Sequence, residues 1–329
     1  MNGKKLAVSV GCPSGIGPEV SVVAASESRG DVLLVGDVDV IARALRGREI
    51  ASRNFEVTDE PRFERGRVLV WQPTKTLAAR DRELGTPSRA GGAAQLAWID
   101  AACDLVSSGV ADALVTGPVS KDAIASSNAP GARRFLGHTE HLQRRLRAKE
   151  VVMAFASDAL TTALVTTHLP IRAVPRAITP ASVATATFWL GDFLAKTRKK
   201  NVQLAVASLN PHAGERGRIG NEETRIAAGI ARAKKRLGRR RVELVGPVPA
   251  ETAFRLAARG DYDGVVAMYH DQATIPMKLL GFGDAVNVTL GLPIVRTSVD
   301  HGTAYDRAAR FDADARGMIA AMQLARTLS

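Results

Sequence analysis

Three histidines share one setting in this chain: each follows a short apolar segment. His168 closes the segment Ala-Leu-Val-Thr-Thr-His, His212 follows Leu-Ala-Val-Ala-Ser-Leu-Asn-Pro, and His270 closes Gly-Val-Val-Ala-Met-Tyr-His. The apolar segments are typical of buried strands, and the carboxyl ends of parallel strands face one ligand-binding crevice. Imidazoles gathered there can hold a divalent metal with open positions for a substrate. Singly, each histidine fits a structural role better, and the shared setting is what favours a metal site, with Asp271 as a residue that orients a ligand.

Other polar residues are suited to an anionic or polar ligand. Gly137-His138-Thr139-Glu140 opens a predicted helix with Thr139 as its N-cap, and backbone N–H groups, a hydroxyl and an imidazole together suit a phosphate. Asn287 lies inside an apolar strand, where a buried amide must find partners. Arg296 follows Pro-Ile-Val, and a guanidinium at a strand end can bind a carboxylate or phosphate with two hydrogen bonds. A capped helix and an internal polar network explain these residues equally well.

Two turns contain glycines in positions that suit a nucleotide or a tight backbone turn. The first, Gly-Cys-Pro-Ser-Gly-Ile-Gly-Pro-Glu at 11–19, follows the first predicted strand and opens a helix, whose N-terminus favours anions. Its spacing is not that of the Rossmann fingerprint. The second, Ser-Val-Asp-His-Gly-Thr-Ala at 298–304, can wrap an adenosine or serve only as a turn. A further turn, Thr-Gly-Pro-Val-Ser-Lys, ends at Lys121, which can reach a phosphate or remain solvated.

The composition indicates a globular enzyme with a basic surface. The formal net charge is +12, and the basic excess is densest at residues 198–200 and 232–241. Both clusters end helix-like segments, where cations oppose the helix dipole, and no aromatic residues interleave with them as a base-stacking platform requires. We therefore expect no nucleic-acid partner, although a basic nucleic-acid binder is the alternative outside the enzymes.

Nothing in the sequence indicates a membrane or an oxidising environment. No apolar stretch approaches the roughly 18 residues that span a bilayer. Lys4 and Lys5 precede an apolar run so short that it reads as a first strand rather than a signal peptide. The 2 cysteines, Cys12 and Cys103, do not make a disulfide framework. We expect a cytoplasmic protein.

Short apolar runs alternate with helical patterns throughout the chain, which predicts a mostly parallel sheet covered on both faces. No linker divides the chain, so a second lobe is expected to be inserted into the first. We predict one lobe from residues 1–130 plus 275–329 and an inserted lobe from 131–274. The predicted strands are 6–10, 32–36, 68–71, 113–116, 151–156, 162–166, 204–208, 242–245, 264–268 and 285–289. The predicted helices are 18–28, 91–108, 139–147, 180–196, 222–235, 249–258 and 313–328.

Taken together, these motifs resemble the 4-hydroxythreonine-4-phosphate dehydrogenase family of vitamin B6 biosynthesis, PdxA. The resemblance runs from about residue 6 to the C-terminus. Its most specific segments are Thr-Gly-Pro-Val-x-Lys, Gly-His-Thr-Glu, Thr-Thr-His-Leu-Pro, Leu-Asn-Pro-His-Ala-Gly-Glu, Ala-Met-Tyr-His-Asp-Gln and Thr-Ser-Val-Asp-His-Gly-Thr-Ala. The implied fold is a two-lobed, three-layer α/β/α architecture similar to isocitrate and isopropylmalate dehydrogenases.

The resemblance assigns roles to the residues singled out above. The metal ligands would be His168, His212 and His270, meeting across the interface of a homodimer and holding Zn, Mg or Co. The substrate would be bound by His138, Thr139, Lys278, Asn287 and Arg296. NAD or NADP would lie against Gly15, Gly17, Asp300, His301, Gly302 and Thr303.

The implied reaction oxidises the hydroxyl of 4-phosphooxy-L-threonine and then releases CO2, giving 3-amino-2-oxopropyl phosphate. Lys278 and Asp271 are the candidate bases. One residue departs from the family pattern: Cys12 stands where the family usually has Asp, which bears on cofactor or substrate preference. A helix terminus beside this cysteine would favour its thiolate and make it sensitive to oxidation. The alternatives are a related D-threonate or D-erythronate 4-phosphate dehydrogenase and, more distantly, a phosphate acyltransferase of related fold.

Overall fold

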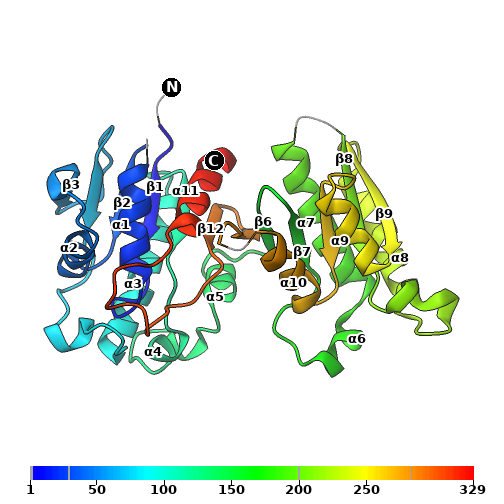
Figure 1. Cartoon of the computed structure of the whole chain (residues 1–329), viewed down its shortest axis with the longest axis horizontal. Coiled ribbons are helices and arrows are strands. Elements are labelled where there is room, and N and C mark those ends of the chain that lie inside the picture. The colour runs from blue at the N-terminus through cyan, green and yellow to red at the C-terminus, as the bar shows by residue number, and fades with distance from the viewer. Residues whose placement is uncertain (1–2, 29, 199–200, 282) are drawn as a thin grey trace. The chain divides into compact units, whose positions relative to one another are not determined.

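The computed structural model describes residues 3–28, 30–198, 201–281 and 283–329, and the chain folds as two compact units (Figure 1). Unit 1 consists of Met1–Ala148 and Leu292–Ser329, and unit 2 consists of Lys149–Gly291. Unit 2 is thus inserted into unit 1. Both of its boundaries lie later in the chain than those of the predicted lobe, 131–274.

The six strands described for unit 1 form a parallel sheet. Their order is β3 (Phe55–Thr58), β4 (Val68–Trp71), β2 (Val32–Val35), β1 (Leu6–Ser9), β5 (Ala113–Thr116) and β12 (Val295–Val299). The central strands are short runs such as Leu-Ala-Val-Ser and Val-Leu-Leu-Val, buried along their whole length, as a parallel sheet covered on both faces requires. The helices are α1 (Gly17–Glu27), α2 (Val38–Gly47), α3 (Arg89–Ser107), α4 (Lys121–Ala125), α5 (His138–Arg145) and α11 (Arg316–Leu328).

The sheet of unit 2 mixes parallel and antiparallel pairs. Its order is β11 (Val286–Leu290), β6 (Val152–Ala156), β7 (Thr161–Leu164), β10 (Gly264–Ala267), β8 (Val202–Ala207) and β9 (Val242–Val248). β6 runs antiparallel to both of its neighbours, whereas β7, β10, β8 and β9 are parallel. The helices are α6 (Val174–Ala177), α7 (Pro180–Thr197), α8 (Glu222–Leu237), α9 (Ala250–Ala258) and α10 (His270–Leu280). Short 3₁₀ segments are η1 (Ser52–Asn54), η2 (Ala79–Arg82), η3 (Ala132–Arg134), η4 (Ile171–Ala173) and η5 (Pro211–Gly217).

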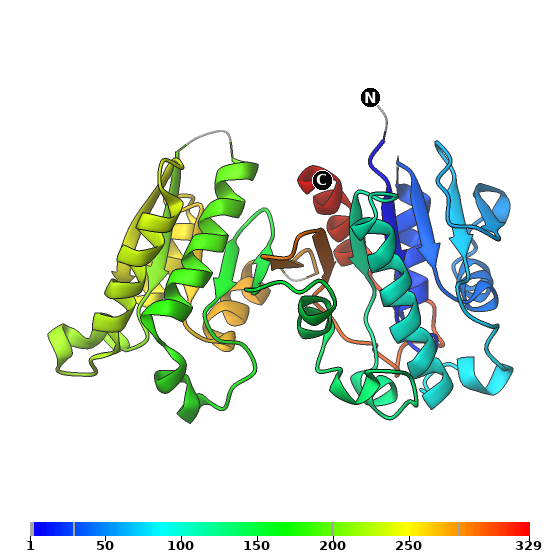
Figure 2. The same ribbon diagram turned by 180° about the vertical axis from the view of Figure 1, so that it is seen from behind.

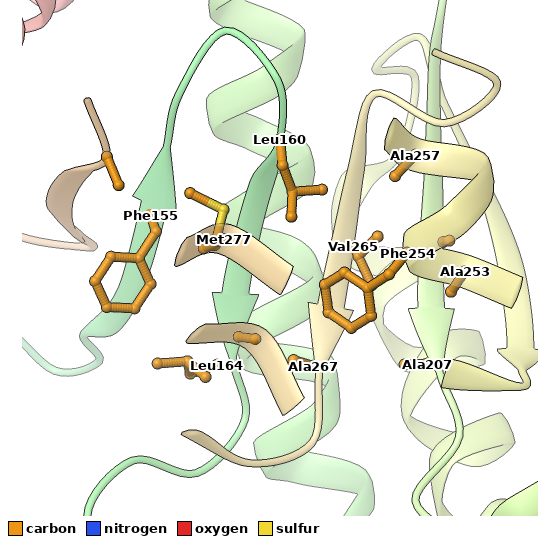
Figure 3. Close-up of a cluster of buried hydrophobic side chains, with 13 residues drawn as sticks. Phe155, Leu160, Leu164, Ala207, Ala253, Phe254, Ala257, Val265, Ala267 and Met277 are labelled. Carbon is orange, nitrogen blue, oxygen red and sulfur yellow. The ribbon is translucent and has the colours of Figure 1, made fainter. Parts of the chain in front are cut away.

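Helices cover both faces of the unit 2 sheet, which makes this unit three-layered. In Figure 1, α9 and α10 lie in front of the strands, and in Figure 2 α7 and α8 lie in front. Figure 3 shows the apolar cluster beneath α9 and α10, where Phe254 and Met277 lie over Leu164, Val265 and neighbouring small residues. The alanines of β8 and β10 let these helices approach the strands closely, so the chain segments that follow the strands are firmly supported.

The predicted strands and helices are found at nearly the predicted positions, with informative exceptions. β3 was not predicted as a strand, because its sequence Phe-Glu-Val-Thr has no continuous apolar run and only Thr58 is buried. Arg296 is the second residue of β12 rather than a residue after a strand. α10 was not predicted as a helix, although it begins at His270 and carries Lys278.

The elements at the two boundaries explain why the units differ from the predicted ranges. α5 belongs to unit 1, so the first crossing comes after residue 145 rather than at 130. β11 pairs with β6 over five residues, from Val286 opposite Ala156 to Leu290 opposite Val152, which keeps residues 275–291 in unit 2.

Within the part of the chain that the structure describes, no helix is both long and apolar enough to cross a membrane.

The basic cluster at 232–241 lies at the end of α8, whose last turn contains Lys234, Lys235 and Arg236, as predicted. Arg236 pairs with Glu150 at 2.7 Å and stacks 4.1 Å from the centre of the Phe188 ring. Lys199 and Lys200 of the other cluster lie outside the described residues.

Candidate metal and phosphate sites

His168 and His270 lie together in unit 2. They follow the adjacent parallel strands β7 and β10, His270 as the first residue of α10, and their ring centres are 5.5 Å apart. Two imidazoles that bind one ion at about 2.1 Å and a tetrahedral angle have ring centres about 5 Å apart. The pair therefore fits a shared divalent metal without rearrangement of the backbone.

The neighbouring carboxylate supports His270 as a ligand. Nδ1 of His270 lies 2.7 Å from Oδ1 of Asp271. With Nδ1 donating to this carboxylate, Nε2 carries the lone pair that a metal needs, which is the arrangement that orients most metal-binding imidazoles. The geometry thus favours Asp271 as an orienting residue.

His212 does not join this pair within one chain. Across residues 3–28, 30–198, 201–281 and 283–329, no group of three or more His, Cys, Asp or Glu side chains is placed to hold a metal. His212 lies beyond β8 on η5, where it is exposed. The structure therefore places two of the three predicted ligands, His168 and His270, side by side, and the metal-binding roles of all three histidines stay a prediction.

The segment that carries His212 has an unusual backbone. Five consecutive residues, from His212 to Arg216, have left-handed φ values between 44° and 73°. Only Gly214 among them adopts this conformation without steric cost, and each L-residue costs on the order of 1 kcal/mol. Such a turn persists only where its surroundings hold it in place, and it points to a functional constraint.

Glu223 holds this turn, and the sequence reasoning missed it. Its buried carboxylate accepts hydrogen bonds from the backbone N–H groups of Leu209 and Asn210, at 3.2 and 2.9 Å, and from Nδ2 of Asn210 at 3.0 Å. A Cβ at Gly214 would lie 2.6 Å from the same carboxylate. The signal that could have found Glu223 is an acidic residue at a buried position of an amphipathic helix, because such a residue needs internal donors.

Unit 1 contains three of the residues expected to bind the substrate: His138 and Thr139, expected at its phosphate end, and Arg296, expected at the rest of it. Arg296 of β12 is 3% exposed, and its Nη2 donates to Oγ1 of Thr116, the last residue of the adjacent strand β5, at 2.6 Å. Burial lowers the pKa of Arg296 to about 9, with Glu140 opposing that shift, so the guanidinium keeps its charge at neutral pH. Thr116 was not predicted as a site residue, although it closes a buried apolar strand.

His138 is a second buried residue of this region, and the charge of Arg296 acts on it. The helix α5 begins at His138 with Gly137 as its N-cap, so Thr139 is not the cap residue that the sequence predicted. Among the described residues, Nε2 of His138 has no hydrogen-bond partner. Burial, followed by the charges of Arg296, His141 and Lys121, lowers the pKa of His138 well below its ordinary value. A neutral imidazole N–H, a helix start and a buried guanidinium form a suitable cradle for a phosphate.

The lowered pKa of His138 predicts that the folded protein loses stability at acidic pH. Because the folded-state pKa is lowered, the unfolded chain takes up a proton first, near pH 6.5, and stability falls as the pH drops below that value. Relative to His138→Gln, the wild type should lose up to about 1.4 kcal/mol of unfolding free energy per pH unit in this range. Urea unfolding of both proteins at pH 7.5 and 5.5, with chelator present, measures the difference. Equal pH slopes for the two proteins would contradict the prediction.

The glycine turn and the loop after β12 pack against each other within unit 1. The backbone N–H of Ile16 donates to the carbonyl of Thr303 at 3.0 Å, and a Cβ at Gly15 would lie 2.6 Å from that oxygen. The Thr303 carbonyl therefore occupies the place of a Gly15 Cβ, and cofactor binding by this glycine stays a prediction. His301 and Gly302 are exposed, and nothing lies within 4 Å of the place where a Gly302 Cβ would be. The loop thus offers a fixed base with an open tip.

Cys12 is inert in this setting. It is fully buried, its Sγ lies 3.5 Å from Oη of Tyr305, and burial raises the pKa of its thiol. The expectation of a reactive thiolate at the helix terminus is therefore wrong, because the side chain is desolvated. The contact instead ties the first turn to Tyr305, directly after the loop that contains Thr303.

The predicted substrate residues are divided between the units. His138, Thr139 and Arg296 belong to unit 1, whereas Lys278 and Asn287 belong to unit 2 with the histidine pair. Lys278 lies on α10, two turns after His270, and is exposed. Asn287 lies on β11 opposite Phe155, and in the described chain its buried Oδ1 has no hydrogen-bond partner.

The architecture and these residues agree with comparisons to known proteins. The family model of the pyridoxal phosphate biosynthetic protein PdxA matches residues 28–325. The chain belongs to the PdxA family. A PdxA relative from Geobacter metallireducens, named 4-hydroxythreonine-4-phosphate dehydrogenase, is 41% identical to this chain. The aligned region covers 98% of this chain and 94% of the relative.

Solved structures extend the likeness to the fold. The crystal structure of 4-hydroxythreonine-4-phosphate dehydrogenase from Klebsiella pneumoniae matches with a TM-score of 0.83 at 33% identity, covering 99% of both chains. A terephthalate 1,2-cis-dihydrodiol dehydrogenase from Burkholderia xenovorans LB400 matches with a TM-score of 0.68 at 26% identity, covering 98% of both. The PdxA fold, a mostly parallel sheet architecture flanked by helices, is therefore confirmed for this chain.

Proposed function

We propose that this protein is a metal-dependent, NAD(P)-linked 4-hydroxythreonine-4-phosphate dehydrogenase, which oxidises and decarboxylates 4-phosphooxy-L-threonine in the biosynthesis of pyridoxal 5'-phosphate. The observation that carries the proposal is the His168–His270 pair, with Asp271 bonded to one ring, in a member of the PdxA family. The names of the relatives support the same activity.

The residues at each proposed subsite fit the group assigned to it. His168 and His270, together with His212 from a second subunit, would hold a divalent cation such as Zn, Mg or Co. The exposed tip of the loop, with His301 and Gly302, and the half-buried Asp300 before it would hold the adenosine of NAD or NADP, and Thr303 would anchor the loop. When bound, the cation stabilises negative charge on the substrate oxygens and the nicotinamide accepts a hydride.

The chain's own residues would bind and orient the substrate. Arg296 and His138 hold the phosphate, because a buried cation and a neutral N–H donor satisfy its oxygens. Asn287 offers a buried amide to the substrate's polar groups. Because Asp271 is engaged with His270, Lys278 is the better candidate to take the hydroxyl proton, and removing that proton allows the hydride to leave.

The proposed assembly is a homodimer, because a third ligand is needed to complete the metal site. Two imidazoles leave a tetrahedral ion short of the three protein ligands typical of catalytic sites. The buried, free state of Cys12 and Cys103 supports a reducing, cytoplasmic location.

The activity is tested by following NAD reduction with 4-phosphooxy-L-threonine, with and without a chelator. We expect turnover that chelation removes and added metal restores, accompanied by CO2 release. NADP, D-threonate 4-phosphate and D-erythronate 4-phosphate are assayed beside it. Faster turnover of either sugar-acid phosphate, or full activity in chelator, would contradict the proposal.

A further inference from the structure

The strands that precede the three histidines are joined at their carboxyl ends by side-chain hydrogen bonds. β7, β10 and β8 are neighbours in that order, and they lead to His168, His270 and His212. The hydroxyl of Thr166, two residues before His168, donates to the carbonyl of Met268 at 2.8 Å. Met268 lies two residues before His270, so this bond links the first two histidine segments.

Gln272 makes the second link. Its Oε1 accepts from the backbone N–H of Met268 at 2.6 Å, and its Nε2 donates to the carbonyl of Ser208 at 2.9 Å. The paired register of β10 with β8 runs from Gly264–Leu204 to Val266–Val206. The side-chain amide of Gln272 therefore acts as one further rung beyond the last paired residues, at the edge where both strands give way to the histidine segments.

The series of hydrogen bonds continues to Asn210, two residues before His212. The hydroxyl of Ser208 donates to the carbonyl of Asn210 at 3.0 Å, and Asn210 is held by Glu223 through its backbone and side chain. A continuous path of hydrogen bonds thus runs from the β7 segment to the left-handed turn, and Gln272 is its central member.

We propose that Gln272 is a positioning residue that fixes the His270 segment relative to the His212 segment and thereby tunes metal affinity in each subunit. The inference rests on the proposed metal site. An amide suits this task because its oxygen accepts from one strand end while its separate NH2 group donates to the other. An ionised carboxylate only accepts, and a hydroxyl has a single oxygen for both roles. Outer residues that orient metal ligands typically change metal affinity 10- to 100-fold when replaced.

The test measures Zn²⁺ and Co²⁺ binding to chelator-stripped full-length protein by calorimetry. Gln272→Met keeps the length of the side chain and removes both hydrogen bonds. We expect its metal dissociation constant to rise about 10- to 100-fold, with turnover largely restored at saturating metal. Gln272→Glu retains the acceptor for Met268 but turns a carboxylate oxygen toward the Ser208 carbonyl, and it should also bind metal more weakly. This second variant is measured if Gln272→Met fails to fold.

The matched control is Gln203→Met at the opposite end of β8. Gln203 also bridges two strands through its amide, donating to Glu243 on β9 at 2.6 Å, but it lies far along the strand from Ser208. We expect its metal affinity to stay within about threefold of the wild type, well below the effect of a residue that orients a ligand. Unchanged affinity in both Gln272 variants, an equal loss in Gln203→Met, or lost turnover that metal does not restore would overturn the inference.

Separate outcomes distinguish a failure of the proposed metal site from a failure of the inference on Gln272. If wild type binds no metal, or if His270→Ala binds it as well as wild type does, then the site itself is wrong. If those two proteins behave as expected and only the Gln272 variants match wild type, the inference on Gln272 alone is wrong.

Discussion

Replacing His270 with alanine is expected to abolish metal binding and to lower kcat/KM by about 1,000-fold or more. Catalytic metals supply several kcal/mol of charge stabilisation, and about 4 kcal/mol corresponds to three orders of magnitude in rate. The ring centre of His270 lies 5.5 Å from that of His168, and Asp271 orients it, so its removal takes away one of the two neighbouring imidazoles. Metal content after purification and turnover across a range of metal concentrations measure the loss.

The matched control for this prediction is His141→Ala. His141 is already bonded to Asp100 at 2.6 Å and contacts Phe135, in unit 1 rather than unit 2. We expect this variant to keep its metal content. Turnover by His270→Ala in the presence of a chelator, at a rate near that of wild type, would exclude metal chemistry at this site.

Replacing Arg296 with methionine should lower catalytic activity without lowering the stability of the fold. Without a bound phosphate, burying a guanidinium is costly, and the lowered pKa of about 9 records that cost. Methionine fills similar volume without a charge, so we expect the unfolding free energy to stay level or rise by about 1 to 3 kcal/mol. The same change removes charge-assisted hydrogen bonds to the substrate, and kcat/KM should fall about 100- to 1,000-fold.

Urea unfolding with and without inorganic phosphate distinguishes the two effects. Wild type should gain stability as phosphate is added, whereas Arg296→Met should gain little, because ligand binding stabilises only where the site exists. Arg62→Met is the control, since Arg62 is an exposed partner of Glu56 and Glu64 and should leave both responses unchanged. A variant that is less stable than wild type in phosphate-free buffer, or one still protected by phosphate, would show that Arg296 serves structure instead.

The fold was predictable where burial leaves a clear pattern. Strands such as β1, β2 and β5 are buried along their full length and are almost entirely apolar, so their positions follow from the residues. β3 could not be found in this way, because an edge strand with polar residues lacks the apolar run of a central strand. α10 was missed because its polar first turn, beginning at His270, reads as a loop, and Pro276 interrupts its pattern.

The site was predictable in its residue types but not in its grouping. Histidines after strands pointed to a metal, and two of the three do meet. The five left-handed residues from His212 to Arg216 could not be foreseen, since four of them are not glycine and the Glu223 carboxylate that anchors the preceding Asn210 comes from a separate helix. The neighbour of Gly15 could not be foreseen either, because a sequence does not show whether a ligand or the Thr303 carbonyl fills the space beside a glycine.

The insertion of unit 2 into unit 1 has a consequence for synthesis on the ribosome. β12 and α11 come after the whole of unit 2, yet β12 pairs with β5 and carries Arg296, which we propose to bind the substrate phosphate. Unit 2 is therefore free to fold as soon as Gly291 has emerged, while unit 1 must wait for the last residues of the chain. Ribosomes that stop early would release a molecule with the histidine pair in place and no means of holding a phosphorylated substrate.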